Sequence, residues 1–148
     1  MDITTEILID APPARVWAVL ADFATYGAWN PFMPQIFGTP QAGARLRVRI
    51  VPPGSGGMTF RPRLLTVTPE RELRWRGHLL VPGLFDGEHR FRLEPTDGGQ
   101  RTLFRHGESF SGLLLPVIFG ARAQAATRAG FEAMNAALKR RAESAATA

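Results

Sequence analysis

The sequence predicts an α+β protein in which an antiparallel sheet is covered by one long C-terminal helix. Three observations support this class. Apolar and polar residues alternate with a period of two in residues 3–9 and again from about 45 to 110. Glycine and proline turns separate the alternating runs. After Gly112 the apolar residues recur with helical spacing, and this helix supplies the cover that the apolar face of a hairpin sheet needs.

The N-terminal elements follow from local patterns. In residues 3–9, the β-branched residues Ile3, Thr5, Ile7 and Ile9 occupy every second position, which is typical of a strand. Two prolines suit the first turn of a helix over residues 12–21, where a missing N–H costs nothing. Residues 26–34 are predicted to form a second short helical turn that is broken at Asn30-Pro31.

The central region is predicted to be β. Pro62 indicates an irregularity or an edge within it, and Asp97-Gly98-Gly99 is a strong hairpin signal. For the whole chain we expect a sheet of about seven strands. The alternating runs are residues 45–50, 58–64, 73–79, 85–94 and 102–110.

The last helix is predicted to continue to about Arg141, and Ser144–Ala148 is expected to fray. One helical stripe carries its buried side chains, namely Val117, Gln124, Phe131, Met134 and Leu138.

Length and composition favour one domain over residues 1–148. The net charge is +5, and there is no cysteine for disulfide or thiolate chemistry. The N-terminus lacks the basic start and apolar stretch of a signal peptide, and no apolar run reaches the roughly 20 residues of a membrane helix, so we expect a cytoplasmic protein. No phosphate-binding glycine-rich loop or nucleophile elbow is present.

The strand over residues 102–110 places Phe104, His106, Glu108 and Phe110 on one face. Its aromatic residues indicate that this face looks inward. A packed core rarely accepts a carboxylate without partners, whereas small-molecule sites combine apolar walls with a few polar groups. We therefore expect an internal cavity between the sheet and the last helix.

His89 on the preceding strand is expected beside this polar pair, because the turn near residues 97–99 aligns it with either His106 or Glu108. A histidine–carboxylate pair makes His106 and Glu108 candidate catalytic residues for acid–base chemistry. Two histidines and a carboxylate also resemble a metal triad. Passive contact with a ligand is the favoured interpretation, and no metal or cofactor is expected.

Arginines occupy the strand positions opposite the apolar residues, so they are expected on the outer face of the sheet. Weak docking to an anionic membrane or an acidic protein is one interpretation. A solvated face that discourages aggregation is the favoured one. Nucleic acid is not expected as a partner, because no aromatic residues interleave the arginines. The arginines are Arg45, Arg47, Arg49, Arg61, Arg63, Arg74, Arg76, Arg90, Arg92, Arg101 and Arg105, offset by Glu72, Asp86, Glu88 and Glu94.

The apolar segment 113–119 follows the last strand. One interpretation makes it a gate at the cavity mouth or a lip that touches a membrane. The favoured interpretation is a buried helix start packed on the sheet, with Pro116 in its first turn.

The element order and an N-terminal block of residues resemble the START-like superfamily, also called SRPBCC, and most closely its bacterial polyketide cyclase/dehydrase and lipid-transport branch. The resemblance covers nearly the whole chain and implies a helix-grip fold, in which a curved sheet wraps around the C-terminal helix and leaves a deep cavity for an apolar ligand. Members include lipid carriers, aromatase/cyclases and chaperone activators, so one activity is not implied. The block comprises Ala11-Pro12, Val16-Trp17, Leu20, Phe23, Tyr26 and Trp29-Asn30-Pro31, and FSGLLLP precedes the last helix.

The predicted function is binding of a small hydrophobic molecule, such as a lipid, polyketide, quinone or steroid-like compound. One alternative is a cyclase or dehydratase that uses His106 or Glu108 for proton transfer, and another is a protein-interaction module without a ligand. Binding is favoured over catalysis. The expected lining residues are Trp75, Phe85, His89, Phe91, Phe104, His106, Glu108 and Phe110 from the sheet, and Gln124, Phe131 and Met134 from the last helix.

Overall fold

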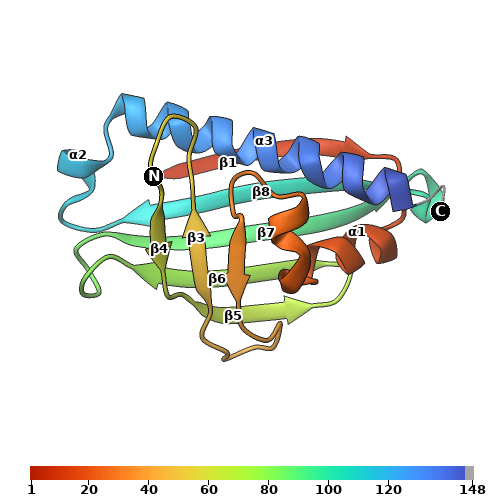
Figure 1. Cartoon of the computed structure of the whole chain (residues 1–148), viewed down its shortest axis with the longest axis horizontal. Coiled ribbons are helices and arrows are strands. Elements are labelled where there is room, and N and C mark those ends of the chain that lie inside the picture. Colours follow the sequence, from red (N-terminus) through yellow and green to blue (C-terminus); the bar gives the residue numbers. More distant parts are fainter. Residues whose placement is uncertain (146–148) are drawn as a thin grey trace.

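The computed structural model describes residues 1–145, in which eight strands and a long C-terminal helix form the bulk of the protein (Figure 1). The strands are β1 (Asp2–Ile9), β2 (Gln35–Phe37), β3 (Arg47–Ile50), β4 (Met58–Phe60), β5 (Arg63–Thr68), β6 (Glu72–His78), β7 (Asp86–Thr96) and β8 (Arg101–Ser111). The helices are α1 (Pro13–Leu20), α2 (Leu115–Ile118) and α3 (Ala121–Ala145), with 3-10 turns η1 (Phe23–Ala28) and η2 (Asp97–Gly99).

The described strands form two antiparallel sheets, where the sequence predicts one sheet of about seven strands. The larger sheet has the order β1-β8-β7-β6-β5, and the smaller has the order β2-β3-β4. The predicted strand over residues 58–64 is divided near Pro62, which lacks the N–H that a continuous ladder needs. Strand β2 was missed because three residues are too few to show alternation. An isolated bridge between Arg45 and Arg63 joins the two sheets at their edge.

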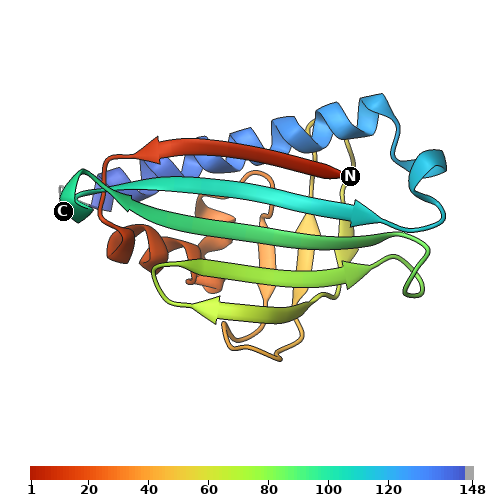
Figure 2. The same ribbon diagram turned by 180° about the vertical axis from the view of Figure 1, so that it is seen from behind.

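The helices and the smaller sheet cover the same face of the larger sheet (Figure 1). Helix α3 runs along β1 and β8, and the smaller sheet crosses in front of β6 and β5. The opposite face of the larger sheet is uncovered (Figure 2). The predicted α+β arrangement with a long helix on antiparallel strands is therefore confirmed. Within residues 1–145, no helix is both long and apolar enough to cross a bilayer.

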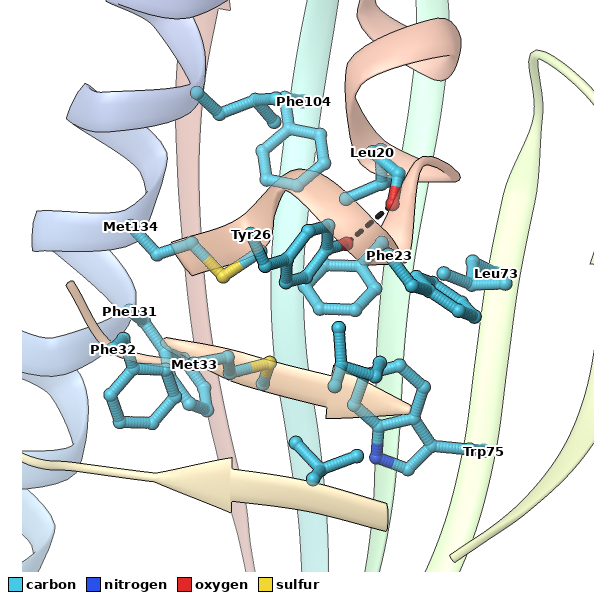
Figure 3. Close-up of a cluster of buried hydrophobic side chains, with 14 of the residues drawn as sticks. Leu20, Phe23, Tyr26, Phe32, Met33, Leu73, Trp75, Phe104, Phe131 and Met134 are labelled. Atoms are coloured by element: carbon cyan, nitrogen blue, oxygen red, sulfur yellow. Dashed lines mark hydrogen bonds between the residues drawn. The ribbon is translucent and has the colours of Figure 1, made fainter. Parts of the chain in front are cut away.

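Buried side chains fill the space between these layers (Figure 3). Phe131 and Met134 project from α3, Phe32 and Met33 precede β2, and Trp75 projects from β6; all five are buried. The rings of Phe32 and Phe131 meet edge to face with centroids 5.5 Å apart. The middle of α3 therefore rests on packed side chains.

The short turns after β1 are held by two polar side chains. The Tyr26 hydroxyl donates to the carbonyl of Leu20, and burial raises the pKa of this phenol. Asn30 Oδ1 accepts from the backbone N–H groups of Phe32 and Met33. The predicted break at Asn30-Pro31 is confirmed, although the helical part covers Phe23–Ala28 where residues 26–34 were predicted. Because Asn30 Oδ1 accepts from the N–H groups of Phe32 and Met33, these groups do not form the backbone hydrogen bonds that would continue the helical turn to residue 34.

The last helix begins later than predicted. Phe119 has a non-helical backbone (φ −125°, ψ 61°) that separates α2 from α3. The prediction that Val117 lies on the buried helical stripe is wrong, because Val117 is exposed. Phe131, Met134 and Leu138 are buried as predicted. Helix α3 continues through Ala145, and the rest of the predicted frayed segment, residues 146–148, lies outside the described residues.

Candidate functional site

The candidate site starts from the register between β7 and β8. Their pairing aligns His89 with Glu108 and Phe91 with His106, which is the second of the two predicted registers. The side chains of His89 and Glu108 are 1% and 16% exposed, and His106 is fully buried. The structure therefore brings the three predicted polar groups together on the inner face of the larger sheet.

A continuous chain of hydrogen bonds links these groups to the protein interior. Glu108 Oε1 lies 2.9 Å from His89 Nδ1, and His89 Nε2 lies 2.7 Å from His106 Nε2. His106 Nδ1 lies 2.9 Å from Asn135 Oδ1, and Asn135 Nδ2 donates to Thr5 Oγ1 at 2.8 Å. Sequence reasoning missed Asn135 and Thr5 as members of the site. The only sequence signal for each was its position, as a polar residue among the inward-facing residues of α3 for Asn135 and of β1 for Thr5.

The partners determine the direction of each hydrogen bond. Thr5 donates its single hydroxyl proton to the carbonyl of His106, so it accepts from Asn135, and Asn135 Oδ1 must accept from His106 Nδ1. A neutral His106 then accepts at Nε2 from His89 Nε2. His89 Nδ1 and Glu108 consequently share one proton, either as an imidazolium and a carboxylate or as an imidazole and a carboxylic acid.

Aromatic rings pack around this chain of hydrogen bonds, which shields it from water and keeps His106 uncharged. Burial lowers the pKa of His106 well below its ordinary value, and nearby His89 adds to the effect, whereas hydrogen bonds to Asn135 and to the backbone of Phe131 oppose it. The Phe131 ring stacks on His106 with centroids 4.0 Å apart, and Trp75 stacks on His89 at 5.2 Å. Of the side chains in this chain of hydrogen bonds, that of Glu108 is the most exposed to solvent.

The predicted lining residues divide into two groups. In the middle of the interface, Phe91, Phe104, Phe131 and Met134 are fully buried and belong to the packed core. Phe91 meets Phe104 at 5.9 Å and His106 at 4.7 Å between ring centroids. Two hollows of about 330 and 340 Å³ open at the surface, and neither includes a predicted lining residue, so neither is the predicted internal cavity.

The second group lies at the end of the interface, beside α2. Phe85, Phe110 and Phe119 form an aromatic trio with ring centroids 4.4 to 5.8 Å apart. Gln124, near the start of α3, is joined to this trio by a hydrogen bond, in which its Nε2 donates to the carbonyl of Phe119 at 3.0 Å. Phe119 was not among the predicted lining residues, although it ends the apolar segment that the sequence singled out.

Exposed apolar side chains flank the trio on the β6–β7 loop, the β8–α2 loop and helix α2. We call Leu80, Val81, Leu113, Val117 and Ile118 the apolar lip; each is between 43% and 81% exposed. Two backbone hydrogen bonds, of 3.0 and 2.8 Å, join the β6–β7 loop to the β8–α2 loop. The favoured prediction of a buried helix start is therefore wrong for Leu113, Val117 and Ile118. The sequence analysis did not identify Leu80 and Val81 as part of this surface, because sequence patterns do not show which loops contact each other.

The geometry disfavours the metal alternative. The facing Nε2 atoms of His89 and His106 are 2.7 Å apart, closer than the roughly 3.3 Å between two nitrogens on a tetrahedral zinc ion. Within residues 1–145, no group of three or more histidine, cysteine, aspartate or glutamate side chains is arranged to hold a metal ion.

The predicted arginine surface is divided between two opposite sides of the molecule. The outer face of the larger sheet, seen in Figure 2, carries arginines that pair with carboxylates, as in Arg74–Glu88 at 3.3 Å and Arg105–Glu94 at 2.9 Å. The arginines on or next to the strands of the smaller sheet pair with no carboxylate among the described residues. The first set is Arg63, which lies beside Arg76, with Arg74, Arg76, Arg90, Arg92, Arg101 and Arg105; within it Arg74, Arg76, Arg101 and Arg105 form ion pairs. The second set is Arg45, Arg47, Arg49 and Arg61.

A long C-terminal helix laid across antiparallel strands, with two short helical turns after the first strand, defines a START-like helix-grip protein. The chain belongs to the polyketide cyclase/dehydrase and lipid transport family, whose family model matches residues 1–143. This confirms the resemblance carried by the N-terminal block.

Solved structures share the fold at low sequence identity. The Zhui aromatase/cyclase from Streptomyces sp. R1128 is 20% identical, with a TM-score of 0.74 over 97% of this chain and 93% of its own. A START superfamily protein from Mycobacterium smegmatis is 18% identical, with a TM-score of 0.75 over 97% of this chain and 98% of its own. These likenesses establish the fold alone. No curated protein matches the sequence.

Proposed function

We propose that the protein binds a small, largely apolar molecule at the end of the helix–sheet interface beside α2. The aromatic trio contacts the body of the molecule, and the Glu108–His89 pair orients its polar group. A lipid, polyketide, quinone or steroid-like compound combines these two features. The observation that carries the proposal is the exposed apolar lip beside an aromatic trio, in which Phe110 and Phe119 are buried and Phe85 is partly buried, close to a carboxylate that is partly open to solvent.

The apolar lip supports this location for the ligand entrance. Monomeric proteins rarely expose contiguous large apolar side chains unless these serve a binding function. Residues 1–145 include ten exposed large hydrophobic side chains, and five of them belong to the lip. The family as a whole is one of hydrophobic-ligand carriers and aromatase/cyclases, which agrees with an apolar entrance.

The environment of Glu108 supports its role as the orienting group. Its Oε1 is held by His89, whereas Oε2 points toward Gly87, where an added Cβ would lie only 2.2 Å away. The missing side chain at Gly87 therefore leaves room for the carboxylate. Oε2 is available to a hydroxyl or enol group of a ligand that enters past the trio.

A second candidate function is acid–base catalysis on the bound molecule. The single proton shared by His89 and Glu108 favours it, because such a pair can accept a proton from a ketone's neighbouring carbon and return it to an oxygen. Cyclisation and dehydration are reactions of this class. The pair would be the catalytic unit, and His106, Asn135 and Thr5 would act by positioning it.

Native mass spectrometry of freshly purified protein tests the binding proposal, because a co-purified molecule appears as added mass. The neutral apolar dye N-phenyl-1-naphthylamine then serves as a probe in fluorescence titrations. We expect Leu113→Ser with Val117→Ser to weaken dye binding at least fivefold. The control, Leu8→Ser with Leu65→Ser, changes two equally apolar exposed residues elsewhere and should leave it unchanged.

The same material separates the alternatives. Glu108→Gln should lower the rate of any chemical conversion of the co-purified molecule without changing its affinity if the pair is catalytic. It should weaken retention of that molecule, with no conversion in either protein, if the pair only orients it. No added mass together with no dye binding would contradict the proposal and favour an interaction module without a ligand.

A further inference from the structure

The outward face of the smaller sheet gathers three arginines around one hollow. Alternate residues point away from the core on its three strands, and the register places Gln35 beside Arg49 and Phe37 beside Arg47. Arg49 also lies beside Thr59 on β4, and Arg61 follows the end of that strand. Together these six residues line a hollow of about 330 Å³. The smaller sheet that carries it lies in front of the larger sheet in Figure 1.

The positive charge of this hollow is not balanced within the protein. No carboxylate among the described residues forms an ion pair with Arg47, Arg49 or Arg61, whereas Arg74, Arg76, Arg101 and Arg105 on the larger sheet all have one. Like charges on neighbouring strand positions destabilise a sheet. An anion in the hollow removes that repulsion.

Several contacts already hold the guanidinium groups in place. Arg47 lies over the Phe37 ring, 4.5 Å from its centroid. Arg49 donates to the carbonyl of Gly56, and Arg45 donates to the carbonyl of Arg61 at 3.1 Å. A guanidinium group has five donors, so these contacts leave donors on Arg47 and Arg49 for a ligand. Side chains that are ordered before binding lose less entropy when they bind an anion.

We propose that this hollow binds the phosphate group of an organic phosphate. A phosphate monoester carries nearly two negative charges and three acceptor oxygens, which suits three guanidinium groups better than a single carboxylate does. The Thr59 hydroxyl and the Gln35 amide supply neutral donors. The hollow is larger than a phosphate group, and the half-exposed Phe37 ring offers apolar contact to the organic part. This site is separate from the ligand site beside α2.

Calorimetric titration with phenyl phosphate at low ionic strength tests the proposal. We expect Arg47→Gln with Arg49→Gln to weaken binding at least about tenfold, since two charge-assisted contacts are lost. The control, Arg76→Gln with Arg92→Gln, removes the same charge from the opposite face and should keep the affinity. Equal weakening by both pairs, or no binding of the unchanged protein to either phenyl phosphate or vesicles that contain phosphatidic acid, would overturn the site. Circular dichroism confirms that each variant is folded.

Sedimentation with vesicles identifies the source of the phosphate. Phosphatidylcholine vesicles with and without phosphatidic acid are compared in the same variants. Binding of phenyl phosphate without vesicle binding assigns a soluble organic phosphate. Vesicle binding that requires phosphatidic acid and is lost in Arg47→Gln with Arg49→Gln assigns a lipid headgroup and still supports the site. Vesicle binding that survives this change, without phenyl phosphate binding, would overturn it.

Discussion

Replacing Gly130 by alanine tests whether packing or helix propensity governs the middle of α3. A Cβ at this position would lie 2.3 Å from Cδ1 and 2.4 Å from Cε1 of Phe32. Carbon atoms pack at roughly 3.5 Å, so the ring must move by about 1 Å. Phe32 is 2% exposed, and its ring meets Phe131 at 5.5 Å and His106 at 6.3 Å. The displacement would therefore reach the ring that stacks on the buried hydrogen-bond chain.

The two effects of this substitution have opposite signs. Alanine favours a helix over glycine by about 1 kcal/mol. Overpacking a rigid core costs about 1–3 kcal/mol. We expect Gly130→Ala to lower the free energy of unfolding by about 1 kcal/mol, which corresponds to roughly 3 °C in Tm for a chain of this size. Helix propensity alone predicts a gain of similar size.

Urea unfolding of four variants measures the effect. Ala129→Gly, at an exposed position next to Gly130, gives the local cost of losing helix propensity without a packing change. Phe32→Leu removes the ring, and we expect it to be less harmful in the Gly130→Ala protein than alone, with a coupling of about 1–2 kcal/mol. If Gly130→Ala stabilises the protein by as much as Ala129→Gly destabilises it, the packing argument is refuted.

Four further outcomes follow from the buried polar groups. Stability should fall as pH drops below about 6.5, because burial lowers the pKa of His106 in the folded protein and the unfolded chain then binds one proton more. Urea unfolding from pH 7 to 5 should show a slope in the free energy of unfolding of up to about 1.4 kcal/mol per pH unit. The substitution His106→Gln should flatten this slope. Gly87→Ala should displace the Glu108 carboxylate from His89, and an unchanged ¹⁵N NMR spectrum of the imidazole nitrogens would contradict this. Tyr26→Phe should cost about 1–3 kcal/mol, because a buried carbonyl loses its donor. Absorbance at 295 nm should report ionisation of this single tyrosine only as the protein unfolds in alkali, since burial raises its pKa; ionisation before unfolding would be inconsistent with the buried position.

Periodicity predicted most elements because their exposed and buried faces repeat locally. The alternation through β7 and β8 identified the inward positions of His89, His106 and Glu108, and all three lie there. The division into two sheets was not predictable, because a strand of three residues carries no period and alternation does not reveal which strands pair.

The site was predicted in part for a related reason. Residues on one strand share a face by parity, so the polar members from β7 and β8 were found. Asn135 and Thr5 complete the same hydrogen-bond chain from α3 and β1, elements far apart in the sequence. The apolar lip depends in the same way on the contact between the loops after β6 and after β8.

By itself the sequence determined the α+β class, the inward residues of the long strands and the family, since each depends on local order along the chain. Only the tertiary structure decided that the middle of the interface is packed and that the arginines divide between two opposite faces. It also decided that His89, His106 and Glu108 join Asn135 and Thr5 in one chain of hydrogen bonds. These features depend on which side chains from distant segments meet, and packing in three dimensions sets those distances.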